Sequence, residues 1–392
     1  MTIIHIELSK AGLGRSGGDT CMVGLISEWK KTQRNVIYTP EHGERDFRRD
    51  GATGDHVEYI CVGSYEIEKR WGILVSWLSR VWKSRRMIRV LPTDDTYVMI
   101  SHSDFFPSVL FPFWMKRLNP QAKWFAFCHM LAPNPFKGYK WQFVKGRWAV
   151  PSLSGLYFWL SQRLFFVLQR RADALISVNS GYEPYLRSKN KNVAIIPLAV
   201  ESGIRACADE PMPEPIYDVC FLGRFHEQKG VFEFVDVVRR IVASGRERVR
   251  AVMIGEHRNA LGEKVVRRIE ELGLQRQIEL AGLQVGKDKC RLVRQSKVFL
   301  LPSYYESFGI VYLEAITLGV PVVEYDLPIY HDHREGVVKV PYLDNAAMAG
   351  AVMDLLDRPD ARRTLGQEGQ EYAKSVSWKS ATAIIEELCL RN

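Results

Sequence analysis

The sequence has few cysteines for its length, and their pattern excludes two common roles. The seven cysteines of this 392-residue chain are odd in number, dispersed, and never form a C-x-x-C pair. A disulfide framework needs paired cysteines, and a structural zinc site needs closely spaced ones. We therefore expect neither a disulfide framework nor a zinc site, and a reducing cytoplasm is the simplest expected location.

Long uninterrupted hydrophobic runs are also missing. The stretch Leu153–Leu168 is interrupted by Ser161, Gln162 and Arg163, so it does not supply the roughly 20 apolar residues that a membrane helix needs. The opening residues, MTIIHIELSK, lack the basic segment and the apolar length of a signal peptide. The sequence predicts a chain that can lie on a membrane surface but does not cross one.

Low-complexity tracts and short internal repeats are absent, and the composition is that of a globular protein. The charge is unbalanced, because 54 Lys and Arg residues against 45 Asp and Glu residues leave a net charge of +9. A positive surface favours acidic partners such as phosphorylated substrates, anionic lipid or nucleic acid, without choosing among them.

Strand-like and helix-like segments alternate along the chain. Strands are expected at 3–7, 36–39, 57–62, 97–101, 124–128, 174–178 and 193–196, and then at 218–222, 252–254, 278–280, 298–301 and 322–323. Such alternation predicts parallel βαβ units in doubly wound sheets. The predicted organisation is a Rossmann-like domain at 1–198, a Pro- and Glu-rich linker at 199–215 and a second Rossmann-like domain at 216–375. A final helix at about 376–392 is expected to pack back on the first domain.

The stretch from Ser303 to Leu318 carries the first candidate site. Glu306 and Glu314 have seven residues between them, and Gly309 is a helix breaker directly before an apolar run. A loop that leads into a helix brings free backbone N–H groups to the helix N-terminus, which attracts phosphate. Two carboxylates that accept hydroxyl protons beside such an anion site suit a nucleotide sugar. An amphipathic helix with two solvated glutamates explains the pattern as well.

A second candidate site follows the expected strand that ends at Leu222. The segment GRFHEQKG contains Gly223, Arg224, Lys229 and Gly230. Ligands of open α/β sheets bind at the carboxyl ends of the strands, so the two cations are placed where they could hold a diphosphate and offset leaving-group charge. The alternative is a solvated loop with incidental charges.

Together these segments resemble the retaining glycosyltransferases of family 4. The resemblance covers nearly the whole chain, and its most specific part is the Glu306-x7-Glu314 pair in LPSYYESFGIVYLEAITLGVPVV. Further matches, in the family's order, are RADALISVNSGYEPYL, IIPLAVE, GRFHEQKG and DRPDARRTLGQEGQEYAKSVSWKSAT. The resemblance implies an α/β protein of the GT-B fold, with two Rossmann-like doubly wound domains that face each other across a deep cleft. It also implies transfer of a sugar with retention at the anomeric carbon.

The resemblance assigns roles to single residues. Arg224 and Lys229 would bind the donor diphosphate, Glu314 the ribose hydroxyls, and Glu306 would face the transferred sugar. His129 matches a histidine beside that sugar. The expected catalytic residues are Glu306, His129, Arg224 and Lys229, and the expected donor-binding residues are Gly17, Gly18, Gly223, Arg224, Lys229, Ser307, Phe308, Gly309, Ile310 and Glu314. The chain departs from the family at Leu198-Ala199, where Asn-Gly is usual.

The resemblance further implies that transfer needs neither a metal nor a cofactor beyond a UDP-, GDP- or ADP-sugar donor. Asp94, Asp95 and Asp104 are the nearest acidic candidates for a metal site, and we interpret them as turn residues. The acceptor would be a glycan or a lipid-linked molecule, bound by the first domain, in the biosynthesis of cell-surface polysaccharide or glycolipid. Nucleic acid is not expected as a partner.

Two basic and aromatic clusters make an anionic membrane surface a further candidate partner. The first cluster contains Trp77, Arg80, Trp82, Lys83, Arg85, Arg86 and Arg89, and the second runs from Lys137 to Trp148. Our hypothesis is that both clusters flank the acceptor site and hold the enzyme at the inner face of the cell membrane. A core helix with a solvated basic face is the alternative for the first cluster.

Other functions remain open at this point. The turn Gly12-x-Gly14-x-x-Gly17 fits the dinucleotide fingerprint, and Glu41 falls near the place where an acidic residue would bind a ribose hydroxyl. An NAD-dependent oxidoreductase is therefore an alternative, and so is a nucleotide-sugar epimerase of the same architecture. A catalytically silent sugar-binding module is disfavoured because both glutamates and both cations are present.

Overall fold

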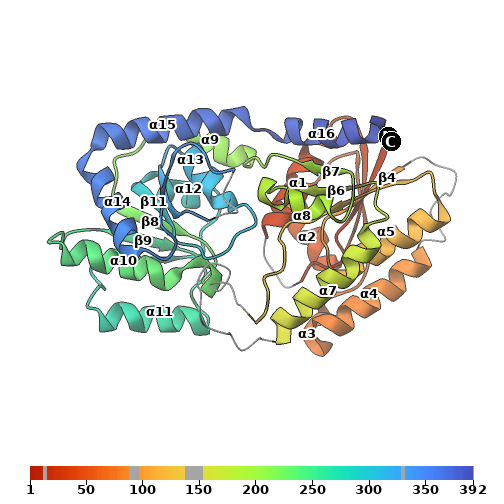
Figure 1. The fold of residues 1–392 in the computed structure, drawn as a ribbon, viewed down its shortest axis with the longest axis horizontal. Coiled ribbons are helices and arrows are strands. Elements are labelled where there is room, and N and C mark those ends of the chain that lie inside the picture. The colour runs from red at the N-terminus through yellow and green to blue at the C-terminus, as the bar shows by residue number, and fades with distance from the viewer. Residues whose placement is uncertain (12–15, 88–96, 137–152, 328–331, 392) are drawn as a thin grey trace. The chain divides into compact units, whose positions relative to one another are not determined.

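The computed structural model describes residues 1–11, 16–87, 97–136, 153–327 and 332–391 (Figure 1). These residues form two compact units. Unit 1 comprises the described residues up to 136, together with 153–198 and 377–391, and unit 2 comprises the described residues of 199–376. Gly12, Gly14, Asp94, Asp95, Arg89 and the second basic cluster lie outside the described residues.

Unit 1 is built on a seven-stranded sheet. In spatial order its strands are β3 (Val57–Cys61), β2 (Arg34–Thr39), β1 (Thr2–Ile6), β4 (Tyr97–Ser101), β5 (Lys123–Phe127), β6 (Ala174–Ser177) and β7 (Val193–Ile195). Every neighbouring pair is parallel. The central strands are near-continuous apolar runs because helices cover both faces of a parallel sheet. The strand order reverses between β1 and β4, which is the topological switch point of this unit.

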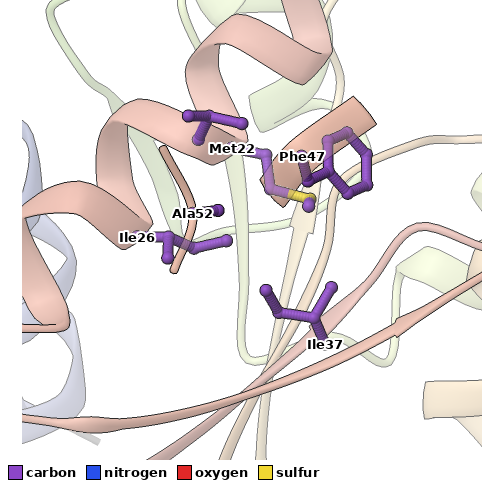
Figure 2. Close-up of a cluster of buried hydrophobic side chains, with 6 residues drawn as sticks. Met22, Ile26, Ile37, Phe47 and Ala52 are labelled. Atoms are coloured by element: carbon purple, nitrogen blue, oxygen red, sulfur yellow. The ribbon is translucent and has the colours of Figure 1, made fainter. Parts of the chain in front are cut away.

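The helices of unit 1 cover its sheet in two groups. They are α1 (Gly17–Trp29), α2 (Glu41–Arg49), α3 (Tyr65–Trp71), α4 (Ile73–Met87), α5 (Phe106–Leu118), α7 (Leu153–Gln169), α8 (Glu183–Arg187) and α16 (Trp378–Arg391), with a 3-10 turn, η2, at Ser180–Tyr182. Part of the core lies where α1 and α2 meet β2, and Figure 2 shows Met22, Ile26, Ile37, Phe47 and Ala52 packed there. On the other side, α5 contacts β4 and β5, and α4 and α7 pack against α5.

Unit 2 is built on a six-stranded sheet, again with parallel neighbours. In spatial order its strands are β10 (Ile278–Gly282), β9 (Ala251–Ile254), β8 (Tyr217–Leu222), β11 (Ser296–Leu301), β12 (Val322–Tyr325) and β13 (Val337–Val340). The order reverses between β8 and β11, so the loops that leave these two strands emerge side by side. Both candidate segments from the sequence, 223–230 and 302–309, are these loops.

The helices of unit 2 are α9 (Ser202–Ala208), α10 (Val231–Ala243), α11 (Ala260–Glu271), α12 (Gly286–Arg294), α13 (Ile310–Thr317), α14 (Asn345–Asp357) and α15 (Pro359–Ser375), with the 3-10 turn η3 at Glu227–Lys229. Two features differ from the sequence prediction. The segment predicted as a linker contains α9, which buries Ile204 and Cys207 and packs on α12 and α13. Strand β13 was not predicted.

Candidate functional site

The two loops at the switch point of unit 2 are held against each other. Gly230 has φ of +68°, and a Cβ on it would lie 1.9 Å from the carbonyl oxygen of Pro302. The backbone N–H of Tyr304 donates to the carbonyl of Gln228 at 2.8 Å, and the Gln228 side-chain amide donates to the carbonyl of Tyr305. Only glycine combines the left-handed backbone with this close approach. The loop after β8 and the loop after β11 therefore form one structural element.

Lys229 and Glu306 meet where these loops touch. The Lys229 ammonium forms an ion pair and hydrogen bond with Oε1 of Glu306, and the Ser303 hydroxyl donates to the same oxygen at 2.9 Å. Glu306 is buried and Lys229 is partly exposed. An ammonium has three N–H donors, so Lys229 can hold Glu306 and still donate to another anion. The structure thus brings together two of the predicted catalytic residues.

Arg224 and Gly223 lie on the same loop. Arg224 is exposed, and its guanidinium makes no ion pair with any described residue. Gly223 donates its N–H to the carbonyl of Ile254 at 3.0 Å, which ties the start of the loop to strand β9. A Cβ on Gly255 would lie 2.0 Å from the carbonyl oxygen of Gly223. The base of the loop is therefore fixed, while the Arg224 side chain is accessible.

Helix α13 begins at Ile310, immediately after the loop that carries Glu306. Its N-cap is Gly309, with φ of +78° and ψ of +60°, and no side chain caps the first turn. A first turn without a side-chain cap leaves backbone N–H groups for another acceptor, such as a phosphate. Ser307 and Phe308 precede the helix rather than forming its first turn, so the amides expected at the helix N-terminus belong partly to the loop.

A buried histidine that no sequence motif pointed to fixes the peptide at this helix start. His333 contacts the Glu324 carboxylate through Nδ1 at 2.8 Å and the Phe308 carbonyl through Nε2 at 2.6 Å. The Tyr312 ring stacks on the His333 ring at 3.8 Å between centroids. In a trans peptide the N–H points opposite to the C=O. The Gly309 N–H is therefore directed away from His333.

Glu314 lies on the second turn of α13, and its partner comes from another helix. The Lys289 ammonium on α12 donates to Oε2 of Glu314 at 2.9 Å, and both side chains are mostly buried. Glu306 is in the loop before α13, and Glu314 is in the helix itself. The reading of both glutamates as solvated residues of one helix face is wrong, because both are buried.

In unit 1, Gly18 and His129 lie together near the carboxyl ends of the strands. A Cβ on Gly18 would lie 3.2 Å from Cδ2 of His129, so the absence of a side chain lets the histidine approach. Burial lowers the pKa of His129 to about 4, so its imidazole is neutral near pH 7. Its Nε2 is buried and has no hydrogen-bond partner among the described residues. Gly17, the first residue of α1, is exposed.

Helix α1 starts at a fixed position beside this pair. Ser16 and Asp19 form a capping box in which each side chain accepts from the other residue's backbone N–H, at 3.1 and 2.7 Å. Lys10 forms an ion pair with Asp19 at 3.1 Å. Next to it, burial and the Asp19 carboxylate raise the pKa of Glu7 to about 8. Unit 1 therefore holds buried ionisable groups at the end of β1 that sequence reasoning missed.

The first basic cluster is not a continuous surface. Trp77 and Arg80 are buried. Arg80 donates to the carbonyl of Leu8 at 3.0 Å and forms an ion pair with Glu68 at 2.8 Å. A guanidinium has several N–H donors, so one arginine can bind a backbone carbonyl and a carboxylate at the same time. Among the described residues, no helix combines the length and hydropathy of a membrane span.

Asp104 is buried rather than exposed in a turn. It accepts a hydrogen bond from the Gln162 side chain, and burial raises its pKa to about 6. Within the described parts of the chain, no group of His, Cys, Asp and Glu side chains could hold a metal ion. All seven cysteines are free.

Comparison with known proteins gives a family match for unit 2. The family model described as "Glycosyl transferases group 1" matches residues 208–372. D-inositol 3-phosphate glycosyltransferase of Corynebacterium glutamicum (strain R) is 28% identical over 176 residues, which are 43% of this chain and 42% of that protein. The match thus spans less than half the length of this curated relative.

Solved structures resemble the whole chain. Sucrose-phosphate synthase from Thermosynechococcus elongatus has a TM-score of 0.71 at 19% identity, with 100% of this chain and 98% of that one covered. Anabaena Alr3699/HepE in complex with UDP-glucose has a TM-score of 0.72 at 12% identity, with 100% and 99% covered. Residues 208–372 therefore match the glycosyl transferases of group 1, and the chain has the GT-B fold of two parallel-sheet α/β domains that the sequence predicted.

Proposed function

We propose that this protein is a retaining glycosyltransferase of family 4 that moves a sugar from a nucleoside-diphosphate sugar to a glycan or lipid-linked acceptor. The observation that carries the proposal is the Lys229–Glu306 pair on two loops that meet at the switch point of unit 2, directly before the uncapped start of α13. The matched family and the UDP-glucose bound to the Anabaena structure support this donor class. Cell-surface polysaccharide or glycolipid biosynthesis is the proposed setting.

In the proposed reaction the bond between the anomeric carbon and the diphosphate oxygen breaks, and a bond to an acceptor oxygen forms on the same face of the sugar. The proton of the acceptor hydroxyl passes to the leaving diphosphate. Negative charge develops on the leaving diphosphate, and a positive group placed there stabilises the transition state. Arg224, Lys229 and the α13 N-terminus are assigned this role. Glu306 is assigned to the transferred sugar and Glu314 to the ribose.

For unit 1, His129 is proposed to bind the transferred sugar, and Gly17 and Gly18 are proposed to bind the donor diphosphate. A neutral imidazole with an unpartnered nitrogen can accept from or donate to a sugar hydroxyl, and the lowered pKa of His129 keeps the ring neutral. We further propose that transfer needs no metal and no cofactor, and that the enzyme works in the cytoplasm, at the inner face of the cell membrane.

The test is a screen of UDP-, GDP- and ADP-sugars with nucleotide release as the readout, with and without a metal chelator. We expect one donor class to be hydrolysed, and the chelator to leave the rate unchanged. Glu306→Gln should lower kcat by about 100-fold or more, because it removes charge placed for the transition state. Glu227→Gln is the matched control, since Glu227 is exposed on the same loop as Lys229.

Wild-type turnover in Glu306→Gln would show that the site is elsewhere. Tight binding of NAD, with no nucleotide released from any donor, would instead favour the oxidoreductase alternative. The comparisons do not favour that alternative, because the matched family is one of glycosyl transferases. NMR of the transferred sugar's anomeric proton decides between retention and inversion.

A further inference from the structure

Helix α4 of unit 1 has its apolar stripe on the outside. Leu74, Leu78 and Trp82 recur every four residues along one face, and Leu78 and Trp82 are 61% and 58% exposed. On a surface helix a stripe with this spacing normally faces the core. The residues of α4 that are buried are instead Ser76, Trp77, Arg80 and Ser84.

Helix α7 likewise exposes apolar residues and buries polar ones. Leu160, Leu164 and Val167 are exposed, Leu164 by 64%, and they lie on one face because they are spaced by three and four residues. The buried side of α7 carries Phe166 together with three polar residues, Ser161, Gln162 and Gln169. Gln162 is used there, since its side chain donates to the carbonyl of Met130 at 2.8 Å and accepts from the N–H of Ala132 at 2.8 Å.

Helices α4 and α7 are neighbours. Both pack against α5 (Figure 1), and the rings of Trp77 on α4 and Tyr157 on α7 lie 6.4 Å apart. Single exposed leucines are ordinary on protein surfaces, but grouped ones mark interaction sites. We call the exposed residues Leu74, Leu78, Trp82, Leu160, Leu164 and Val167 the outward apolar face.

The charged residues on the helices of this face and on α5 are all basic, and acidic residues lie nearby at Glu66 and Glu68 on α3, which packs against α4. Helices α4, α5 and α7 contain no Asp and no Glu. Arginines border the apolar residues, with the Arg86 guanidinium 3.9 Å from the centre of the Trp82 ring and that of Arg163 4.3 Å from the Trp159 ring. A second copy of this chain would bring like charges together, whereas an anionic bilayer supplies the opposite charge. Tryptophan and arginine beside leucines are typical of helices that lie in the headgroup region.

We propose that the outward apolar face of α4 and α7 docks on an anionic membrane, with its leucines and Trp82 inserted among the lipids and its arginines at the headgroups. The basic clusters predicted attraction to such a surface; the structure assigns insertion to two named helices, one of which lies outside those clusters. The inference deepens the proposed function by placing the acceptor at a membrane, but binding itself needs no catalysis.

Flotation of the full-length protein with lipid vesicles tests this. We expect recovery with phosphatidylglycerol–phosphatidylcholine vesicles, little with phosphatidylcholine alone, and a decline as salt increases. The pairs Leu78→Glu with Trp82→Glu, and Leu160→Glu with Leu164→Glu, should each reduce recovery at least tenfold. Leu283→Glu is the matched control, because Leu283 is 66% exposed in unit 2; this variant should float like the wild type.

Absence of wild-type flotation on anionic vesicles, or undiminished flotation of both paired variants, would overturn the proposal. A second outcome would also overturn it: the wild type sediments as a dimer and does not bind vesicles, and both paired variants sediment as monomers. The face would then be a self-association surface. Melting followed by circular dichroism checks that the variants are folded. Nucleotide release from the donor should persist in the paired variants. A protein that floats but hydrolyses no donor would refute the proposed function and leave the membrane face intact.

Discussion

At the scale of single residues, the two glutamates of the candidate site differ in what holds them. Glu306 is in the loop, where Lys229 and Ser303 both contact one of its carboxylate oxygens. Glu314 is in the helix and is held by Lys289 at 2.9 Å. A group beside the reacting sugar acts on the transition state, whereas a group on the ribose binds substrate and transition state alike. The proposed roles therefore predict different kinetic changes.

Glu314→Ala should raise the KM for the nucleotide-sugar donor by roughly 10- to 100-fold, the loss of a hydrogen bond to a charged group. Its kcat should stay within a few-fold of the wild type, because uniform binding is removed. Lys289→Ala should change KM in the same direction through the lost contact with Glu314. Lys287→Ala is the control, since Lys287 lies on the same helix with its side chain 88% exposed. A fall in kcat without a change in KM would contradict the ribose assignment.

The sequence pointed to Glu306, Glu314, Arg224 and Lys229, but not to the residues that position them. Lys289 lies 25 residues before Glu314 and on another helix, so no local spacing connects them. His333 and Glu324 reach the Phe308 peptide through the tertiary fold. Motif spacing reveals residues that share one loop or helix. It does not reveal partners such as Lys289 and His333, which come close only when segments distant in sequence become neighbours in the fold.

At the scale of elements, the central strands were predictable from the sequence, whereas the edge strand β13 and the short helix α9 were not. Strands such as β4 and β11 are buried on both faces and read as short apolar runs. Strand β13 is a four-residue edge strand that contains the exposed Lys339, so it lacks that signal. Helix α9 has seven residues within a Pro- and Glu-rich stretch. Its packing on α12 and α13, rather than its composition, makes it helical.

The junction of the two switch-point loops gives a prediction at this scale. Gly230→Ala should destabilise unit 2 by about 3 kcal/mol or more, because it adds left-handed strain and a clash with the Pro302 carbonyl. Gly273→Ala is the matched control, since Gly273 has φ of +67° and open space around its missing Cβ; roughly 1–2 kcal/mol is expected there. Urea unfolding measures both. Equal losses would mean that backbone strain alone explains the Gly230 requirement.

At the scale of the whole molecule, the chain returns to unit 1 after it has completed unit 2. Helix α16 packs along α1. The Trp29 indole N–H donates to Glu386 at 2.8 Å, and the Lys123 ammonium donates to the carbonyl of Cys389. Such contacts between the two ends of the chain carry no local sequence signal. The sequence predicted that a final helix packs back on the first domain, but not which residues make the contacts.

Another of these contacts lies between Gly24 of α1 and Trp378 of α16. A Cβ on Gly24 would lie 2.1 Å from the indole of Trp378, whereas Gly350, also inside a helix, has nothing within 4 Å of its missing Cβ. Alanine in a helix interior is favoured over glycine by about 0.5–1 kcal/mol, so Gly350→Ala should raise the Tm. Gly24→Ala should lower it, at a cost of about 1–3 kcal/mol for overpacking.

A double-mutant cycle with Trp378→Ala separates this clash from other effects of the glycine. If Trp378 is the obstacle, Gly24→Ala should cost much less in the Trp378→Ala background, and a coupling free energy of about 1 kcal/mol or more should appear. Thermal unfolding of the four proteins measures it. If Gly24→Ala costs the same in both backgrounds, α16 does not depend on this contact. The attachment of the C-terminal helix to unit 1 would then rest on the Trp29–Glu386 and Lys123–Cys389 hydrogen bonds.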